Sequence, residues 1–250
     1  MVAADARIHD DVHVGPYAVI GADVTIGAGS RIESHVVIKG PTVIGANNHI
    51  FQFTSIGDDP QDKKYKGEKT TLVIGDRNTI REYCTINRGT VQDRGETSIG
   101  NDNWIMAYCH IAHDCVVGDS TIFANNASIA GHVHVGDYAV LGGFTAVHQF
   151  CRIGAHSLTS MFSYVTMDVA ACVIVSGRPA EARGINTEGL KRRGFTPEQL
   201  RNLKAAYRTV YRESLKLDEA IALLEPRTAA EPELRIFLES LRAGSRGLVR

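Results

Sequence analysis

A six-residue repeat of aliphatic residues runs through most of this 250-residue chain and limits the folds that it can adopt. Two charged stretches interrupt the repeat, and after the second it continues one residue out of phase. No α-helix or ordinary β-hairpin series has this period, which is typical of a parallel β-helix. The repeated positions include Val2, Ile8, Val14, Ile20, Ile26, Ile32, Ile38, Ile44, Ile50, Ile56, Ile74, Ile80 and Ile86, and then Ile99, Ile105, Ile111, Val117, Phe123 and Ile129.

The fifth position of each repeat, counted from the aliphatic residue, supports this fold. Small residues such as Ala18, Ser30 and Thr42 occur there, as expected for a narrow interior that already holds one aliphatic side chain per face. Most of the cysteines share this position, and we predict that they are inert core residues rather than metal ligands. They are Cys84, Cys109, Cys115 and Cys151.

The repeat divides the chain into two expected domains. Residues 1–183 are predicted to form a mainly β domain, a parallel β-helix interrupted by loops at 57–71 and 88–98. Charged loops that leave a regular solenoid are often functional. Residues 184–250 carry helical signals instead, including the N-cap and capping-box pattern "TPEQ" at Thr196–Gln199. Two further helices are expected around 218–224 and 232–241, which makes this part a C-terminal α-helical domain.

Composition narrows the functional classes. The formal net charge is −1, so charge gives no reason to expect a nucleic-acid partner. Residues 184–250 are nevertheless basic, with 13 Lys and Arg against 9 Asp and Glu, which suits an acidic partner or a solvated helix face. The longest apolar run is too short to span a bilayer, and the first residues do not resemble a signal peptide. With five cysteines and no CxxC pair, a reducing cytoplasm is the expected compartment.

Histidines cluster on one edge of the predicted β-helix. Three repeats make a coil of 18 residues, so residues 18 apart are neighbours in one column. His113 then lies above Gly131 and Gln149, with His132 and His148 in adjacent columns. Two chemistries fit this cluster. A zinc site needs three imidazoles on one ion, whereas general-base catalysis needs one imidazole beside an oxyanion donor, such as the unobstructed N–H of a glycine.

Several motifs resemble a known family over nearly the whole chain. They are "HIAHDC" (110–115), "ANNASIAGH" (124–132), "GGFTAVHQFCRIGAH" (142–156), "INTEGLKRRGF" (185–195) and the closing "RGLVR". All are similar to the cytoplasmic UDP-N-acetylglucosamine O-acyltransferases, hexapeptide-repeat enzymes that begin lipid A synthesis. The resemblance implies a left-handed β-helix and a homotrimer with active sites between subunits. Handedness rests on the resemblance alone, since parallel crossovers are normally right-handed.

The resemblance also implies an activity and a set of site residues. The reaction would transfer an (R)-3-hydroxyacyl chain from acyl carrier protein to the 3-hydroxyl of UDP-N-acetylglucosamine. His113 matches the family's general base and Gly131 its oxyanion amide, and no metal or other cofactor is implied. The matching substrate-binding positions are Asp62, Lys64, His110, His132, His148, Gln149, Asn186, Glu188, Arg192 and Arg193.

Met161 is a candidate determinant of acyl length. Its column holds the compact residues Ala107, Asn125 and Gly143 before the long methionine. An acyl chain lying along this edge would stop at Met161, so we expect chains of about ten carbons to be preferred over longer ones. Plain packing is the alternative interpretation of this methionine.

Three other functions remain open from the sequence. The related N-acyltransferases of the same pathway normally carry an additional N-terminal uridine-binding domain, whereas this chain begins with repeats. Zinc-dependent β-helical carbonic anhydrases share the fold but lack the "GLKRRGF" segment. An inactive structural solenoid would need neither the histidine cluster nor the charged loops.

Overall fold

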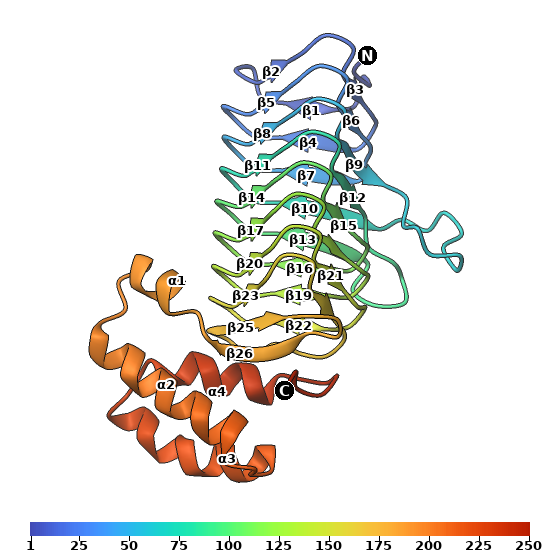
Figure 1. The fold of residues 1–250 in the computed structure, drawn as a ribbon. Coiled ribbons are helices and arrows are strands. Elements are labelled where there is room, and N and C mark those ends of the chain that lie inside the picture. The colour runs from blue at the N-terminus through green and yellow to red at the C-terminus, as the bar shows by residue number, and fades with distance from the viewer.

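The computed structural model describes all 250 residues and has the predicted fold. Two sheets of 8 strands and one of 10 wind around a common core, and helices follow at the C-terminal end. Figure 1 shows the stacked coils as a solenoid, with the N-terminus at one end and the helices at the other. The predicted class, a parallel β-helix with a C-terminal helical region, is confirmed.

Each sheet takes one strand from each coil. The first sheet contains β1 (Arg7–Ile8), β4 (Val24–Ile26), β7 (Thr42–Ile44), β10 (Thr71–Ile74), β13 (Glu96–Ile99), β16 (Val116–Val117), β19 (His134–Val135) and β22 (Arg152–Ile153). The second contains β2 (His13–Val14), β5 (Arg31–Ile32), β8 (His49–Ile50), β11 (Thr79–Ile80), β14 (Trp104–Ile105), β17 (Ile122–Phe123), β20 (Val140–Leu141), β23 (Leu158–Thr159), β25 (Val173–Ser176) and β26 (Glu181–Ile185). The third contains β3 (Val19–Ile20), β6 (Val37–Ile38), β9 (Ser55–Asp58), β12 (Thr85–Asn87), β15 (His110–Ile111), β18 (Ser128–Ile129), β21 (Ala146–Val147) and β24 (Tyr164–Val165).

Strand register follows the repeat. Ser128 pairs with Ala146 and Ile129 with Val147, both 18 residues apart, as the column count predicts. From Ile20 to Ile153 the aliphatic residue of each repeat is buried, whereas Val2 in the first coil is 49% exposed. The four cysteines predicted to be core residues, Cys84, Cys109, Cys115 and Cys151, are free and buried, and so is Cys172. Two excursions leave the solenoid, one between β9 and β10 and one between β12 and β13 (Figure 1).

The corner between the third and first sheets positions the site. Asp114, His132 and Phe150 occupy this corner in successive coils, with φ values of 59°, 64° and 66°. This left-handed backbone conformation is uncommon for residues with a side chain, and here it forms the tight bend from one sheet to the next. Because the bend recurs in each coil, side chains at the same corner position stack above one another. The rings of His132 and Phe150 are parallel, with centroids 4.3 Å apart.

The C-terminal helices close one end of the solenoid. They are α1 (Thr187–Arg192), α2 (Pro197–Arg212), α3 (Leu217–Leu224), the 3₁₀ helix η1 (Glu225–Ala229) and α4 (Leu234–Arg242). The predicted capping box is present, because Thr196 and Gln199 bond to each other's backbone N–H groups. β25 and β26 pair antiparallel and end the parallel stack; β26 contacts α2, and α4 lies beyond this last pair of strands (Figure 1). The proposed division at 183/184 remains a prediction. None of the helices combines the length and apolar character that crossing a membrane requires.

Candidate active site

A cleft of about 520 Å³ lies on the outer face of the third sheet. It brings together several residues that the sequence placed in one site, because successive coils set them side by side. The predicted residues in its wall are His110, His113, Gly131, His148 and Gln149. The rest of the wall consists of Gln61, Ala112, Ser128, Ile129, Ala130, Ala146, Val147 and Tyr164.

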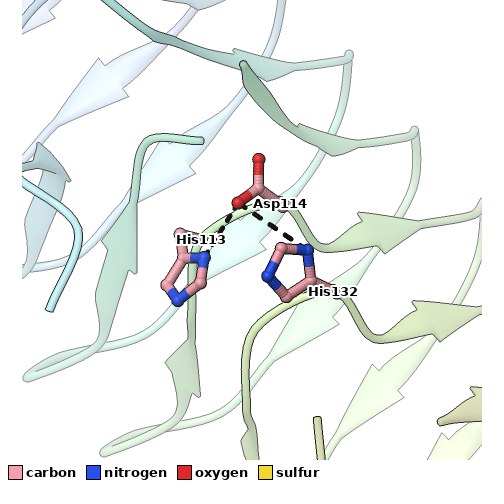
Figure 2. Close-up of side chains that lie close together, drawn as sticks. All are labelled: His113, Asp114 and His132. Atoms are coloured by element: carbon pink, nitrogen blue, oxygen red, sulfur yellow. Dashed lines mark hydrogen bonds and ion pairs between the residues drawn. The ribbon is translucent and has the colours of Figure 1, made fainter. Parts of the chain in front are cut away.

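His113 and Asp114 form a hydrogen-bonded pair at the cleft (Figure 2). His113 Nδ1 lies 2.8 Å from Asp114 Oδ2, and the Asp114 side chain is fully buried. Burial alone would raise the pKa of this carboxyl group, but hydrogen bonds from His113 and Thr90 outweigh it, and the pKa is lowered. Asp114 is therefore held as a carboxylate, which orients the imidazole and leaves its Nε2 as the proton acceptor.

Residues of the second excursion, which the repeat does not single out, fix this carboxylate. Thr90 donates its N–H to Asp114 Oδ1 at 2.8 Å and its hydroxyl to Oδ2 at 2.6 Å. The N–H of Asp114 donates to Thr97 Oγ1 at 2.8 Å. The charge of the excursion was a signal of function, but no repeat indicates which of its residues reach the corner.

His132 has a carboxylate partner of its own. Its Nδ1 lies 2.7 Å from Asp93 Oδ2, whereas the distance to Asp114 Oδ2 is 3.8 Å and too long for a hydrogen bond. Its ring stands edge-on to that of His113, with centroids 5.0 Å apart, as Figure 2 shows. Asp93 thus keeps His132 from competing with His113 for the buried Asp114 carboxylate.

The same three side chains could be considered as metal ligands. One candidate ligand atom from each of His113, Asp114 and His132 lies within 4.8 Å of the others. The oxygens of Asp114, however, already accept hydrogen bonds from His113 and Thr90. The Nδ1 atoms of both histidines contact carboxylates, an arrangement that also occurs around zinc-bound histidines and does not decide between the two chemistries. With Asp114 engaged in these hydrogen bonds, only two imidazoles remain, whereas a zinc site needs three or four protein ligands, so the contacts favour a proton-transfer site.

Gly131 forms the part of the wall beside the His113 ring. A Cβ atom at this glycine would lie 2.5 Å from His113 Cε1 and 2.7 Å from Nε2, so only glycine fits there. The Gly131 N–H donates to no acceptor within the protein. It is therefore available to a ligand oxygen next to the imidazole, the arrangement that stabilises an oxyanion.

Three buried or half-buried histidines predict that the free energy of unfolding depends on pH. Burial lowers the pKa of His110, His134 and His156. Between the usual histidine pKa of about 6.5 and the lower folded-state values, the unfolded chain binds more protons than the folded protein. Stability should be complete above this window and decrease as pH falls through it. We expect a lower thermal unfolding midpoint at pH 5.5 than at pH 8, and a smaller difference in His134→Gln. An equal or higher midpoint at pH 5.5 would contradict this expectation.

The first excursion carries Asp62 and Lys64, but neither lines the cleft. Asp62 Oδ1 accepts the Lys64 N–H at 2.9 Å, and the Lys64 side chain is exposed. The neighbouring Gln61 reaches the cleft wall instead. Arg88, 7% exposed, fastens this excursion to the solenoid through the Gly57 carbonyl, the Asp59 carboxylate and the Tyr65 hydroxyl. The six-residue repeat gave no indication of this role of Arg88.

The remaining predicted residues lie on another face of the same chain. Asn186, Arg192 and Arg193 line a separate pocket of about 310 Å³ beside the second sheet. Asn186 is buried and caps α1 by accepting the Gly189 N–H, while its amide donates to the His156 carbonyl. Both arginines are exposed. Within one chain they do not join the His113 cleft.

Glu188 and Met161 lie outside both pockets. Glu188 is exposed and forms an ion pair of 2.8 Å with Lys191, one turn along α1. Met161 is 65% exposed. Its Cε lies 3.9 Å from the position that a Cβ on Gly143 would occupy, so its side chain runs along the predicted column of compact residues.

The fold and the cleft define a class of protein, and comparison with known proteins supports it. The family described as bacterial transferase hexapeptide (six repeats) matches residues 5–40 and 96–131. The family described as UDP-N-acetylglucosamine O-acyltransferase, domain 2, matches residues 168–249. The protein is thus a hexapeptide-repeat transferase.

Full-length relatives identify the family within this class. The acyl-[acyl-carrier-protein]–UDP-N-acetylglucosamine O-acyltransferase of Thiobacillus denitrificans is 58% identical over 100% of this chain and 97% of its own length. That of Stutzerimonas stutzeri is 56% identical over 98% and 95%. A solved structure of LpxA from Acinetobacter baumannii superposes with a TM-score of 0.98 at 47% identity, covering 100% of this chain and 97% of that one. The chain belongs to the UDP-N-acetylglucosamine O-acyltransferase family.

Proposed function

We propose that this protein transfers an (R)-3-hydroxyacyl chain from acyl carrier protein to the 3-hydroxyl of UDP-N-acetylglucosamine, the first step of lipid A synthesis. The observation that carries the proposal is the His113–Asp114 pair beside the unbonded N–H of Gly131, in a chain of the acyltransferase family. A base and an oxyanion donor on one wall are what acyl transfer to a hydroxyl requires.

The reaction can be written with the side chains of the cleft. Asp114 accepts the Nδ1–H of His113, so Nε2 removes the proton from the sugar hydroxyl as its oxygen attacks the thioester carbonyl. The Gly131 N–H stabilises the oxyanion by about 3 kcal/mol. When the tetrahedral intermediate collapses, the C–S bond breaks and the ester remains on the sugar. The proton held by His113 passes to the leaving sulfur.

The distribution of the other site residues favours shared sites in a homotrimer. Arg192 and Arg193 carry charge suited to a pyrophosphate, yet they line a pocket away from His113. A neighbouring copy can bring its arginines to the cleft, where Asp62, Lys64, His110, His132, His148, Gln149, Asn186 and Glu188 complete the proposed binding set. Co-expressed His113→Ala and Arg193→Ala chains should then recover part of the activity that each lacks alone. No recovery in mixed oligomers would argue for sites within single chains.

Met161 is proposed to end the acyl groove. In its column the Met161 side chain lies against Gly143, with Cε 3.9 Å from the position of a Cβ on that glycine, so a longer chain would meet the thioether. Replacing Met161 by glycine should shift the preferred donor from about ten carbons towards fourteen, because each added methylene can then be buried. Met161→Leu keeps the bulk and should keep the preference. Competition between donors of different length measures the shift, and an unchanged profile in Met161→Gly would refute the assignment.

The activity is tested with purified protein, 3-hydroxyacyl carrier protein and UDP-N-acetylglucosamine, in parallel assays with and without a metal chelator. The expected product is the 3-O-acylated sugar nucleotide, identified by mass and by its ester linkage. Transfer that disappears with the chelator and returns with zinc would support the metal alternative. No transfer with donors of any length would overturn the proposed function.

A further inference from the structure

The C-terminal segment 245–249 is fastened to the last coil, where the chain turns from the third sheet to the first. Asp168 lies beside Arg152 of β22, because Val169 pairs with Ile153, and its buried side chain accepts the Arg152 N–H through Oδ1 at 2.7 Å. Its Oδ2 accepts the N–H groups of Ser245 and Arg246 at 2.7 and 2.8 Å. Its own backbone donates to the Gly247 carbonyl and accepts the Val249 N–H. Hydrogen bonds to a buried carboxylate are strong and directional, so this segment has a defined position.

This attachment directs Arg246 towards the cleft. Arg246 Nη2 lies 3.4 Å from His148 Nδ1, and His148 is part of the cleft wall. Arg246 is exposed and forms no ion pair with a carboxylate. An unpaired cation is thus held at the margin of the cleft.

The position of Arg246 fits one part of the acyl donor. The Arg246 guanidinium lies at His148, two coils from Ala112 beside His113, which is about 10 Å at the spacing of neighbouring strands. The donor's thioester must lie at His113, while the carrier protein stays outside the cleft. The arm between them is phosphopantetheine, which has a phosphodiester at the end attached to the protein. Arginine is well suited to bind such a phosphate.

Resting on the proposed function, we propose that Arg246, positioned by Asp168, binds the phosphate of the donor's phosphopantetheine arm. The proposal places the C-terminal segment at the end of the cleft where the acyl donor enters. The His113–Asp114 pair does not account for binding at that end. The matched control is Arg250, another arginine of the same segment. It is exposed and its Nη2 lies 3.4 Å from the Leu215 carbonyl, so it is directed at the helices rather than at the cleft.

The test compares Arg246→Gln and Arg250→Gln with two small donors, an acyl phosphopantetheine and the same acyl pantetheine without phosphate. Arg246→Gln should raise the KM for the phosphorylated donor about tenfold, the value of one charge-assisted hydrogen bond. It should change neither kcat nor the KM for the unphosphorylated donor by more than about twofold. Arg246→Lys should recover part of the affinity, and Arg250→Gln should behave as the unchanged protein.

Other outcomes would overturn the assignment. Equal losses with both donors would show that Arg246 only supports the fold. A higher KM for UDP-N-acetylglucosamine would assign the cation to the sugar nucleotide. An effect seen with acyl carrier protein but not with free acyl phosphopantetheine would move the contact to the acidic surface of the carrier. If the unchanged protein transfers acyl groups and Arg246→Gln has the same kcat and KM values with both donors, only this inference fails. If the unchanged protein transfers nothing, the proposed function itself fails.

Discussion

Replacement of His113 by alanine is expected to lower kcat about a thousandfold, because general-base catalysis contributes factors of 10² to 10⁴. The structure gives this histidine the requirements of a base. Its Nδ1 is bonded to a buried carboxylate, and only 13% of its side chain is exposed. Without the imidazole, the sugar hydroxyl would have to lose its proton to water. Steady-state rates at saturating donor and acceptor measure the effect.

The control for His113→Ala is His35→Ala. His35 is exposed and stacks between Tyr17 and Phe53 on a different corner, so its loss should leave kcat unchanged. Asp114→Asn should also reduce kcat by at least about a hundredfold, because an amide can stabilise the wrong imidazole tautomer. Both variants should keep the circular dichroism of the native fold. Near-normal turnover in His113→Ala would move the base to another residue of the cleft.

Gly131→Ala is expected to reduce kcat about a hundredfold without removing any catalytic group. The new methyl carbon would lie 2.5 Å from His113 Cε1, so the imidazole must move. Asp114 cannot follow it, because Thr90 holds both carboxylate oxygens. The variant keeps the backbone N–H of residue 131. Its loss of activity therefore measures the displacement of His113. The kinetic assay gives the loss in kcat, and a thermal unfolding scan of the same variant shows whether the fold is retained.

A double-mutant cycle provides the decisive control for Gly131. If Gly131→Ala acts by moving His113, it should have little further effect in a His113→Ala background, since coupled residues are not additive. Independent, additive losses would mean that the alanine obstructs the substrate directly. Full activity in Gly131→Ala would mean that the backbone around residue 131 moves to accommodate the methyl group and leaves His113 in place.

The sequence predicted those parts of the site that follow the repeat. His113, Gly131 and Gln149 were expected in one column, and all three line the cleft. The helices also lie close to their predicted positions, because the capping box and the apolar spacing are local signals. Such predictions succeed when the interactions that fix a residue come from neighbours at a constant separation along the chain.

Contacts made by the excursions and by the C-terminal segment could not be predicted in this way. Thr90 and Asp93 bond to residues 24 and 39 positions away, and Arg246 approaches a residue 98 positions away. None of these three separations is a multiple of the 18-residue coil. The sequence also could not predict that Arg193 lies in a different pocket from His113. The helical motif that contains Arg193 does not indicate which face of the solenoid its helix covers.

The sequence by itself determined the β-helix, its core and the column that contains the candidate base. It did so because a six-residue period permits only one regular way to bury an aliphatic side chain on each face. Only the tertiary structure decided how that base is held, through the hydrogen bonds from Thr90 to Asp114 and between Asp93 and His132. It also decided where Asp168 binds the C-terminal segment. These hydrogen bonds form after the coils have stacked, and their geometry depends on irregular segments that no repeat encodes.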